Sequence, residues 1–239
     1  MKIVRSEADE RKLLELTKKG LARRPRSEDK LHVSDLMYPR KTYWQKIDPQ
    51  PMTDDQALYF TAGRAHHEIL EFVIGSRKKR NGRADAGEHE RDGVYFSPDL
   101  RMSFGPIEIK TSRSMYEPKN LAKGYDGYLK QLKMYMALMD SQKGGLLVFY
   151  LVLNVFKGGR QRKMPALRFY RVTMTPQELK KERAAIKKNA VALKEAIKKK
   201  KWARLDLCPE WLCRDCVFFQ RCKPWLQDAK RKNLQKGVA

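Results

Sequence analysis

The longest apolar run of the chain, residues 144–156, is rich in β-branched and aromatic residues and predicts a buried central strand. A segment over 167–172 predicts a neighbouring strand. Helices are expected over 127–140 and over 176–201, the second one capped by Thr175. We therefore expect an α/β fold with a mixed central sheet flanked by helices.

Two acidic residues stand at strand positions upstream of this run. An apolar strand over 94–99 ends in Asp99, and a second strand over 107–110 alternates apolar and polar residues. Residues 100–105 are expected to form the turn between them. If the two strands form a hairpin, Asp99 lies near Glu108 on its polar face.

Two carboxylates this close are costly unless a cation lies between them. Mg²⁺ and Mn²⁺ are hard ions that prefer oxygen ligands, and such an ion polarises a phosphate and lowers the pKa of a bound water. Lys110, two residues after Glu108, can orient that water or offset charge on the phosphate. The alternative is an ordinary hairpin with a surface Glu–Lys pair, which the E-x-K triplet alone favours.

Further polar residues lie on the predicted helices. Gln131 and Tyr135 are four residues apart and therefore share one helix face. Upstream, a helix is expected over 63–71, from which His67 can offer a nitrogen ligand to the same metal while His66 points elsewhere. A lone histidine on a helix is more often structural or solvated, so the hypothesis that His67 binds metal depends on the acidic residues downstream.

These residues resemble the motif series of RecB-like nucleases in the PD-(D/E)xK superfamily. The matching series is Gly63-x-x-x-His67, Asp99, Glu108-x-Lys110 and Gln131-x-x-x-Tyr135. The resemblance covers roughly residues 30–155. The segments 33–36 and 40–44 are similar to the start of the iron–sulfur exonucleases associated with CRISPR spacer acquisition, the Cas-four type, and of their phage-borne relatives.

The resemblance implies a restriction-endonuclease-like core and assigns roles to its residues. It implies metal ligation by His67, Asp99, Glu108 and the carbonyl of Ile109. It implies a catalytic site formed by Asp99, Glu108, Lys110, Gln131 and Tyr135, the last two as positioning residues. We expect a basic arm or helix over 1–30, the nuclease core over 31–201, and a cysteine-cluster cap with a basic tail over 202–239.

All the cysteines lie in one short window with the spacing C-x4-C-x2-C-x5-C: Cys208, Cys213, Cys216 and Cys222. Nothing resembles a signal peptide or a transmembrane span, so we expect a reducing compartment without structural disulfides. Clustered thiols then indicate a metal or cluster site, and Cys₄ suits either Zn²⁺ or an iron–sulfur cluster. Chance clustering of buried cysteines is the alternative.

The last three cysteines resemble the C-terminal triplet of the same family, which favours an iron–sulfur cluster, [4Fe–4S] before [2Fe–2S], with zinc as the alternative occupant. The family's first cysteine comes from its N-terminal region, where this chain reads Met37-Tyr38-Pro39. Cys208 is the candidate for the missing ligand. The cluster would then close the C-terminal segment alone, in a structural role.

The charge of the chain is strongly one-sided. Lys and Arg number 52 against 28 Asp and Glu, a net charge of +24, which favours binding to phosphate backbones. A solvated lysine-rich surface is the plainer interpretation of such a composition. Aromatic residues beside basic ones, such as Tyr43, Trp44 and Tyr116, either stack on unpaired bases or belong to the core.

We therefore expect a Mg²⁺- or Mn²⁺-dependent deoxyribonuclease in the cytoplasm of a bacterial, archaeal or phage-infected cell, with no membrane partner. The resemblance implies an exonuclease on single strands or DNA ends, with 5′ to 3′ polarity. It leaves recombination, CRISPR-adaptation or phage proteins as prospective partners. The alternatives are a sequence- or structure-selective endonuclease of the same superfamily and a non-catalytic basic DNA-binding module.

Overall fold

A computed structural model of the chain describes residues 11, 15, 18, 30–79, 88–157, 160–214 and 216–222, without the side chains of 67, 70–79 and 157. The chain divides into two compact units. These are Met1–Val33 with Pro51–Ala184, and Ser34–Gln50 with Ala185–Ala239. The predicted arm over 1–30 lies almost wholly outside the described residues. No helix in the described ranges is long and apolar enough to cross a membrane.

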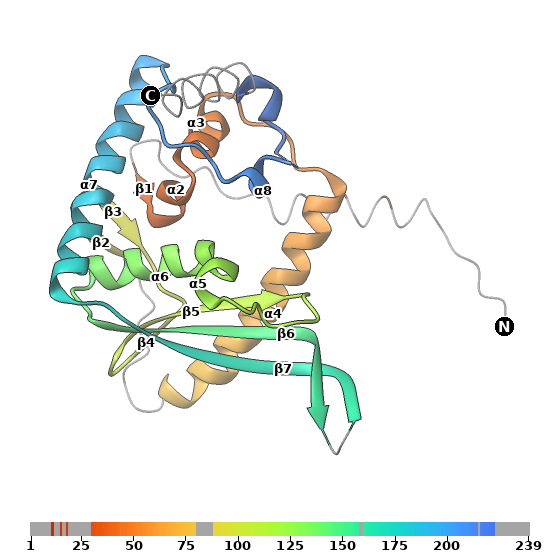
Figure 1. Ribbon diagram of the computed structural model, residues 1–239. Coiled ribbons are helices and arrows are strands. Elements are labelled where there is room, and N and C mark those ends of the chain that lie inside the picture. The colour runs from red at the N-terminus through yellow and green to blue at the C-terminus, as the bar shows by residue number, and fades with distance from the viewer. Residues whose placement is uncertain are drawn as a thin grey trace, which may run out of the picture. The chain divides into compact units, whose positions relative to one another are not determined.

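The first unit is built on a four-stranded mixed sheet in the order β4-β5-β6-β7 (Figure 1). Its strands are β4 Leu100–Met102, β5 Gly105–Ser112, β6 Lys143–Lys157 and β7 Arg160–Thr173. Strands β5 and β6 are parallel, while β4 and β7 run antiparallel to their neighbours at the two edges. The apolar run over 144–156 is thus the inner strand β6, as predicted, and the mixed α/β fold is confirmed.

Both faces of the inner strands are buried. Leu146 and Val148 are fully buried on one face of β6. On the other face, Leu147 packs in a cluster with Ile107 and Ile109 of β5. Residues 144–148 are all buried, and a strand covered on both sides needs apolar residues at every position, so this part of β6 does not alternate. Farther along the strand, Val152 and Phe156 are exposed.

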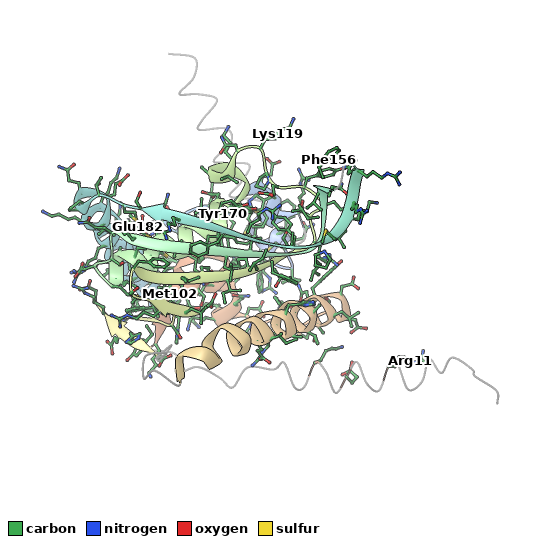
Figure 2. All side chains as sticks on the ribbon, turned by 90° about the horizontal axis from the view of Figure 1, so that it is seen from below. Arg11, Met102, Lys119, Phe156, Tyr170 and Glu182 are labelled. Carbon is green, nitrogen blue, oxygen red and sulfur yellow. The ribbon has the colours of Figure 1, made fainter. Side chains whose placement is uncertain are left out.

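Helices cover both faces of this sheet (Figure 1, Figure 2). Helix α6 Asp126–Leu138 packs on β5 and β6, and helix α4 Asp54–Lys79 packs on β5. Helix α5 Leu121–Gly124 precedes α6, and helix α7 Pro176–Lys199 follows β7. On one face, a Cβ at Gly144 would lie 2.9 Å from the sulfur of Met136 of α6, so the glycine permits close approach of helix and sheet. On the other face, the ring of His66 of α4 lies 6.1 Å from that of Phe149.

A second, three-stranded sheet has the order β1-β3-β2. Its strands are β1 Leu31–His32, β2 His89–Arg91 and β3 Val94–Phe96. Asp92 and Gly93 make the β2–β3 turn with positive φ angles of 56° and 72°. Arg183 of α7 donates to both carboxylate oxygens of Asp92, at 2.6 and 3.4 Å, and so ties the turn to that helix.

The predicted hairpin between residues 94–99 and 107–110 is wrong in its first strand. Residues 94–96 form β3 of the small sheet, and the hairpin partner of β5 is β4, where a turn was expected. The chain leaves the small sheet at Pro98, which has no N–H to donate to a ladder. Leu100 then pairs with Ile107, and the turn is confined to the residues between β4 and β5.

The start of α7 confirms the predicted cap. The Thr175 hydroxyl accepts from the Glu178 N–H at 3.2 Å, and the Glu178 carboxylate accepts from the Thr175 N–H at 2.7 Å. This reciprocal pair is a capping box, which satisfies two backbone donors that would otherwise lack helical partners. The helix ends at Lys199, two residues before the predicted end.

The second unit joins two distant segments of the chain. Helix α3 Pro39–Ile47 packs with the C-terminal segment that contains α8 Glu210–Cys213. Trp44 of α3 lies 5.6 Å from Trp202, ring to ring, and Asp48 forms an ion pair with Arg221. Packing rather than a shared cysteine therefore brings residues 34–50 together with residues 185–222.

Candidate active site

Asp99 is held at the edge of β5 by the backbone. Strand β4 begins at Leu100, opposite Ile107, so no residue of β4 pairs with β5 beyond that point. There, the Asp99 Oδ2 accepts a hydrogen bond from the Ile109 N–H at 2.6 Å. The carboxylate takes the place of a neighbouring strand's carbonyl, which fixes it beside Glu108. The contact of Asp99 with β5 thus arises from the start of β4 rather than from the predicted hairpin.

Glu108 and Lys110 lie together on one face of β5. In the parallel register, Glu108 pairs with Leu146 and Lys110 with Val148, so both side chains lie on the face covered by α6. Glu108 is fully buried and accepts a hydrogen bond from the Lys110 ammonium. A buried carboxylate is costly without a charged partner, and Lys110 supplies that partner.

The local charges keep Lys110 protonated. Burial lowers the pKa of Lys110, but the negative charges of Glu108 and Asp99 outweigh burial, so the pKa lies above its ordinary value. The ammonium therefore carries its charge at neutral pH. An ammonium paired with a buried carboxylate is a fixed positive charge on an inner strand of the sheet.

Helix α6 completes the cluster. Lys110 Nζ donates to the Gln131 side-chain carbonyl at 3.2 Å, and the Gln131 amide donates to the Tyr135 hydroxyl at 2.9 Å. The i,i+4 spacing places both residues on one face of α6, as predicted. We call Asp99, Glu108, Lys110, Gln131 and Tyr135 the Glu108 cluster.

Tyr128 is a neighbour of this cluster that the sequence analysis missed. Lys110 Nζ lies 5.8 Å from the centroid of the Tyr128 ring, within range of a cation–π contact. Tyr125 stacks on Tyr128 at 5.9 Å. Tyr128 precedes Gln131 by three residues, and this i,i+3 spacing on the same helix face was the available signal.

The predicted histidine ligand is not tested by the structure. His67 lies in α4, but its side chain is outside the described ones. Its neighbour His66 has Nδ1 2.7 Å from the Ala62 carbonyl and packs against Phe149, on the sheet face opposite Glu108. His66 thus has a structural role, and ligation by His67 stays a prediction.

The donor atoms of the cluster fit a hard divalent cation. Asp99 and Glu108 offer carboxylate oxygens, the ligand type that Mg²⁺ and Mn²⁺ prefer. Within the described residues, no three His, Cys, Asp or Glu side chains form a group with metal-binding geometry. The case for a divalent cation therefore depends on the oxygen chemistry of the two acids and on the hydrogen bond that holds Asp99 to the amide next to Glu108.

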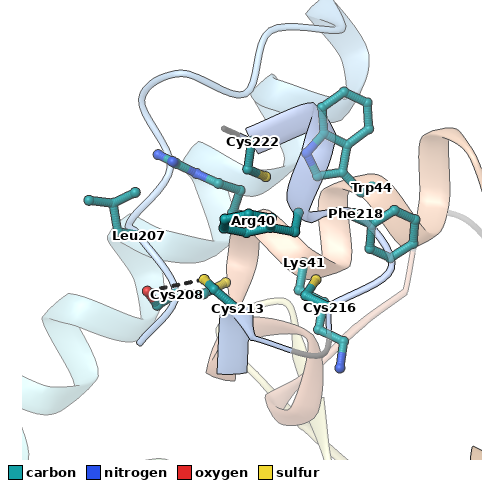
Figure 3. Close-up of a pocket in the computed structure, with 10 residues that line it drawn as sticks. Arg40, Lys41, Trp44, Leu207, Cys208, Cys213, Cys216, Phe218 and Cys222 are labelled. Atoms are coloured by element: carbon teal, nitrogen blue, oxygen red, sulfur yellow. Dashed lines mark hydrogen bonds between the residues drawn. The ribbon is translucent and has the colours of Figure 1, made fainter. Parts of the chain in front are cut away.

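The four cysteines of the second unit line one pocket (Figure 3). The pocket is lined by Arg40, Lys41, Trp44, Leu207, Cys208, Cys213, Cys216, Phe218, Phe219 and Cys222. All four thiols are free, and the Cys213 sulfur lies 3.9 Å from the Cys208 carbonyl. Burial raises the pKa values of Cys208, Cys213 and Cys222. Four thiols are a donor set whose chemistry suits Zn²⁺ or an iron–sulfur cluster, although no three of these described cysteines form a group with metal-binding geometry.

Arg40 was not predicted as a member of the cysteine site. Its guanidinium is buried, donates to the Leu205 carbonyl and lies 5.1 Å from the Trp202 ring. Burial lowers its pKa, and the charges of Cys222 and Cys208 oppose that shift. A positive charge therefore stands among the four thiols, and it comes from helix α3, far from the cysteines in the sequence.

The fold and the Glu108 cluster define a mixed α/β protein with a carboxylate–lysine site at the centre of its sheet. No protein-family model matches the chain, and no curated protein matches its sequence. Among solved structures, the chain is similar to SSO0001, with a TM-score of 0.51 and 20% identity over 87% of this chain and 93% of that one. This likeness shows a shared fold.

Two further solved structures are similar at lower scores. One is a phage-related exonuclease from Haemophilus somnus 129PT, with a TM-score of 0.44 and 12% identity over 70% of this chain and 96% of that one. The other is an alkaline exonuclease from Laribacter hongkongensis, with a TM-score of 0.43 and 14% identity over 78% of this chain and 96% of that one.

Proposed function

We propose that the chain is a Mg²⁺- or Mn²⁺-dependent deoxyribonuclease with a PD-(D/E)xK core. The observation that carries the proposal is the arrangement of Asp99, Glu108 and Lys110. Asp99 is clamped to the Ile109 amide, and Glu108 is paired with Lys110 next to it. Two acids and a lysine in this arrangement suit phosphodiester hydrolysis, and the net charge of +24 suits a polyanionic substrate.

Asp99 and Glu108 would hold the divalent ion, with the Ile109 carbonyl and His67 as the other proposed ligands. When bound, such an ion polarises a phosphate oxygen and lowers the pKa of a coordinated water. Loading the site requires Glu108 to share its carboxylate between the ion and Lys110. The buried position of Glu108 keeps that carboxylate in one place for both partners.

The other cluster residues act on the substrate through Lys110. Its ammonium holds a proton at Nζ and offsets the negative charge that develops on the phosphate during attack. Gln131 fixes Nζ from the helix side at 3.2 Å, and Tyr135 fixes Gln131 in turn. Gln131 and Tyr135 are therefore proposed as positioning residues, because they act by orienting the lysine.

We also propose that the enzyme is an exonuclease acting on single strands or DNA ends, from 5′ to 3′. A linear and a circular single strand of the same sequence, incubated with Mg²⁺, Mn²⁺ or EDTA, test the proposal. An exonuclease degrades the linear strand with metal and leaves the circle intact. Cutting of the circle supports the endonuclease alternative, and binding without cleavage of either strand supports the non-catalytic module.

The four cysteines are proposed to hold an iron–sulfur cluster, [4Fe–4S] before [2Fe–2S], with Zn²⁺ as the alternative occupant. The proposal is supported by the pocket that all four cysteines line together with residues of α3. Cys208 takes the fourth ligand position in this proposal. The cluster would then stabilise a unit whose two chain segments are otherwise joined by packing around Arg40 and Trp44.

The biological setting of the proposal rests on the motif resemblance alone. It places the chain near the Cas-four type and its phage-borne relatives, inside a bacterial, archaeal or phage-infected cell. Proteins of recombination, CRISPR adaptation or phage replication are the prospective partners. DNA is the partner that the charge of the chain itself supports.

A further inference from the structure

The three aromatic residues considered for base stacking differ in exposure and lie in different units of the chain. Tyr43 is buried, and Trp44 packs against Tyr43 and Trp202 in the second unit. Tyr116 is 62% exposed and belongs to the first unit, in the loop that follows β5. Tyr59 of α4 is 56% exposed and contacts the same loop. The exposed aromatic rings thus lie beside the strand that carries Glu108.

Arg113 and Tyr59 form a stacked pair at the end of β5. The Arg113 guanidinium lies 4.3 Å from the centroid of the Tyr59 ring, and both side chains are exposed. Arg113 follows Lys110 by three residues, roughly 10 Å along an extended strand, and lies on the α4 side of the sheet, so a DNA strand would reach both by passing the end of β5. A guanidinium plane supported by an aromatic ring is a surface on which an unpaired base can stack.

Hydrogen bonds hold the loop in place. The Ser114 hydroxyl donates to the Tyr116 carbonyl at 2.7 Å and accepts from the Tyr116 N–H at 3.2 Å. The Asn154 N–H of β6 donates to the Met115 carbonyl at 2.9 Å, which joins the loop to the inner strand of the sheet. These bonds fix the backbone at Met115 and Tyr116, so the exposed ring of Tyr116 has less conformational freedom to lose when it binds a base.

The charge exposed by this loop is positive. Its one acid, Glu117, accepts hydrogen bonds from the Arg168 guanidinium and, at 2.8 Å, from the Tyr170 hydroxyl. Burial raises the pKa of Glu117, but these two hydrogen bonds lower it by more, so its net pKa lies below the ordinary value. The carboxylate is therefore ionised, and the Arg168 guanidinium of β7 balances its charge. Arg113 and Lys119 of the loop and Lys123 of the following helix α5 remain exposed (Figure 2 labels Lys119). The loop thus combines rings for bases with cations for phosphates.

We propose that Tyr59, Arg113 and Tyr116 form a stacking platform for the unpaired bases of a DNA strand whose backbone passes the Glu108 cluster. The platform rests on the proposed nuclease function and narrows its substrate to DNA with at least a short unpaired stretch. Duplex DNA buries its base faces in its own stack, so it gains the phosphate contacts without the stacking.

The test compares binding of two strands by the full chain in EDTA, which withholds the metal needed for cleavage. One is an oligothymidylate, and the other is an abasic strand with the same number of phosphates. Stacking is worth at least about 5-fold in affinity per base, so the wild type binds the base-bearing strand at least that much more tightly. The Tyr59→Ala/Tyr116→Ala variant loses this preference and keeps its affinity for the abasic strand.

Two matched variants control for other effects of the substitutions. Tyr116→Phe keeps the ring, so it keeps the preference for bases. Leu58→Ala removes a side chain from the same helix with nearly the same exposure, 57% against 56% for Tyr59, and also keeps the preference. Thermal unfolding of each variant confirms that the compared proteins are folded.

The outcomes separate this inference from the proposed function. Equal affinity of the wild type for both strands, in a protein that still cleaves DNA with metal, overturns the platform and leaves the nuclease standing. A preference that survives in the double alanine variant also overturns the platform. A folded wild type that neither binds nor cleaves any strand overturns both.

Discussion

Lys110 Nζ donates to the side-chain carbonyl of Gln131 at 3.2 Å, and this bond joins the inner strand β5 to helix α6. The two residues are 21 positions apart in the chain, yet they meet because α6 lies over the face of β5 that carries Glu108. The buried acid, its lysine and the side-chain carbonyl that accepts from the lysine are therefore expected to contribute to stability together.

Removal of Lys110 is expected to destabilise the fold. Lys110→Met leaves Glu108 buried without its main countercharge, and breaking a buried pair costs about 3–5 kcal/mol. The Glu108→Leu/Lys110→Met double variant loses both charges and is expected to recover most of that stability. Urea denaturation of the two single variants and the double variant measures the coupling. A Lys110→Met variant within about 0.5 kcal/mol of wild type, the range of ordinary surface changes, would contradict the pairing.

Three tyrosines whose hydroxyl groups meet are expected to have raised pKa values. The Tyr125 hydroxyl contacts those of Tyr150 and Tyr170. Burial raises the pKa of Tyr170 to about 12 and raises those of Tyr125 and Tyr150 as well. Because the folded state favours the neutral phenols, their contribution to stability is complete below pH ~10, the unfolded pKa. It is lost as the pH rises through the folded values.

Tyrosinate absorbance during a titration of the folded chain measures this effect. Of the ten tyrosines, at least these three are expected to stay neutral beyond the main transition and to ionise normally after denaturation. The pKa values of Tyr43 and Tyr95 are raised too, the first by burial and the second mainly by its hydrogen bond with Glu90. Tyr150→Phe removes one of the three late groups and serves as the assignment control. Ionisation of all ten in one step near pH ~10 while the fold persists would show that the cluster is not buried as described.

The cysteine pocket is expected to hold iron when the protein is prepared without air. Metal analysis of the purified chain should give iron with inorganic sulfide, and Cys216→Ser should lower both. Arg40→Gln, which removes the positive charge among the thiols, is expected to lower the reduction potential of the cluster, since a nearby cation favours the reduced form. Stoichiometric zinc without iron would overturn the iron–sulfur proposal and leave a structural zinc site.

Much of the core fold could be predicted from local pattern. The apolar run of β6, the alternation of β5 and the Thr175–Glu178 capping box each act within a few residues, so the sequence alone predicts them. Strand β4 could not be found in this way, because three residues are too few to show a period. Its existence depends on pairing with β5 and on the break at Pro98.

The sequence predicted the residues of the Glu108 cluster but not all of their contacts; Tyr128 was missed, and His67 stays a prediction. The spacing of Glu108 with Lys110 and of Gln131 with Tyr135 placed each pair on one face. The clamp between Asp99 and the Ile109 amide depends on where β4 begins, which the sequence does not reveal. Arg40 could not be assigned to the cysteines because it reaches them through the packing of α3 with the C-terminal segment.

Cleavage of an end-labelled single strand by wild type and Glu108→Gln tests the central claim most directly. The measurement uses Mg²⁺, Mn²⁺ and EDTA, with Glu195→Gln as the matched control on the exposed face of α7. We expect metal-dependent degradation by wild type and Glu195→Gln and a loss of at least about 100-fold in Glu108→Gln, since the proposed metal and the lysine both depend on that carboxylate. Equal cleavage by a folded Glu108→Gln variant would place the chemistry elsewhere.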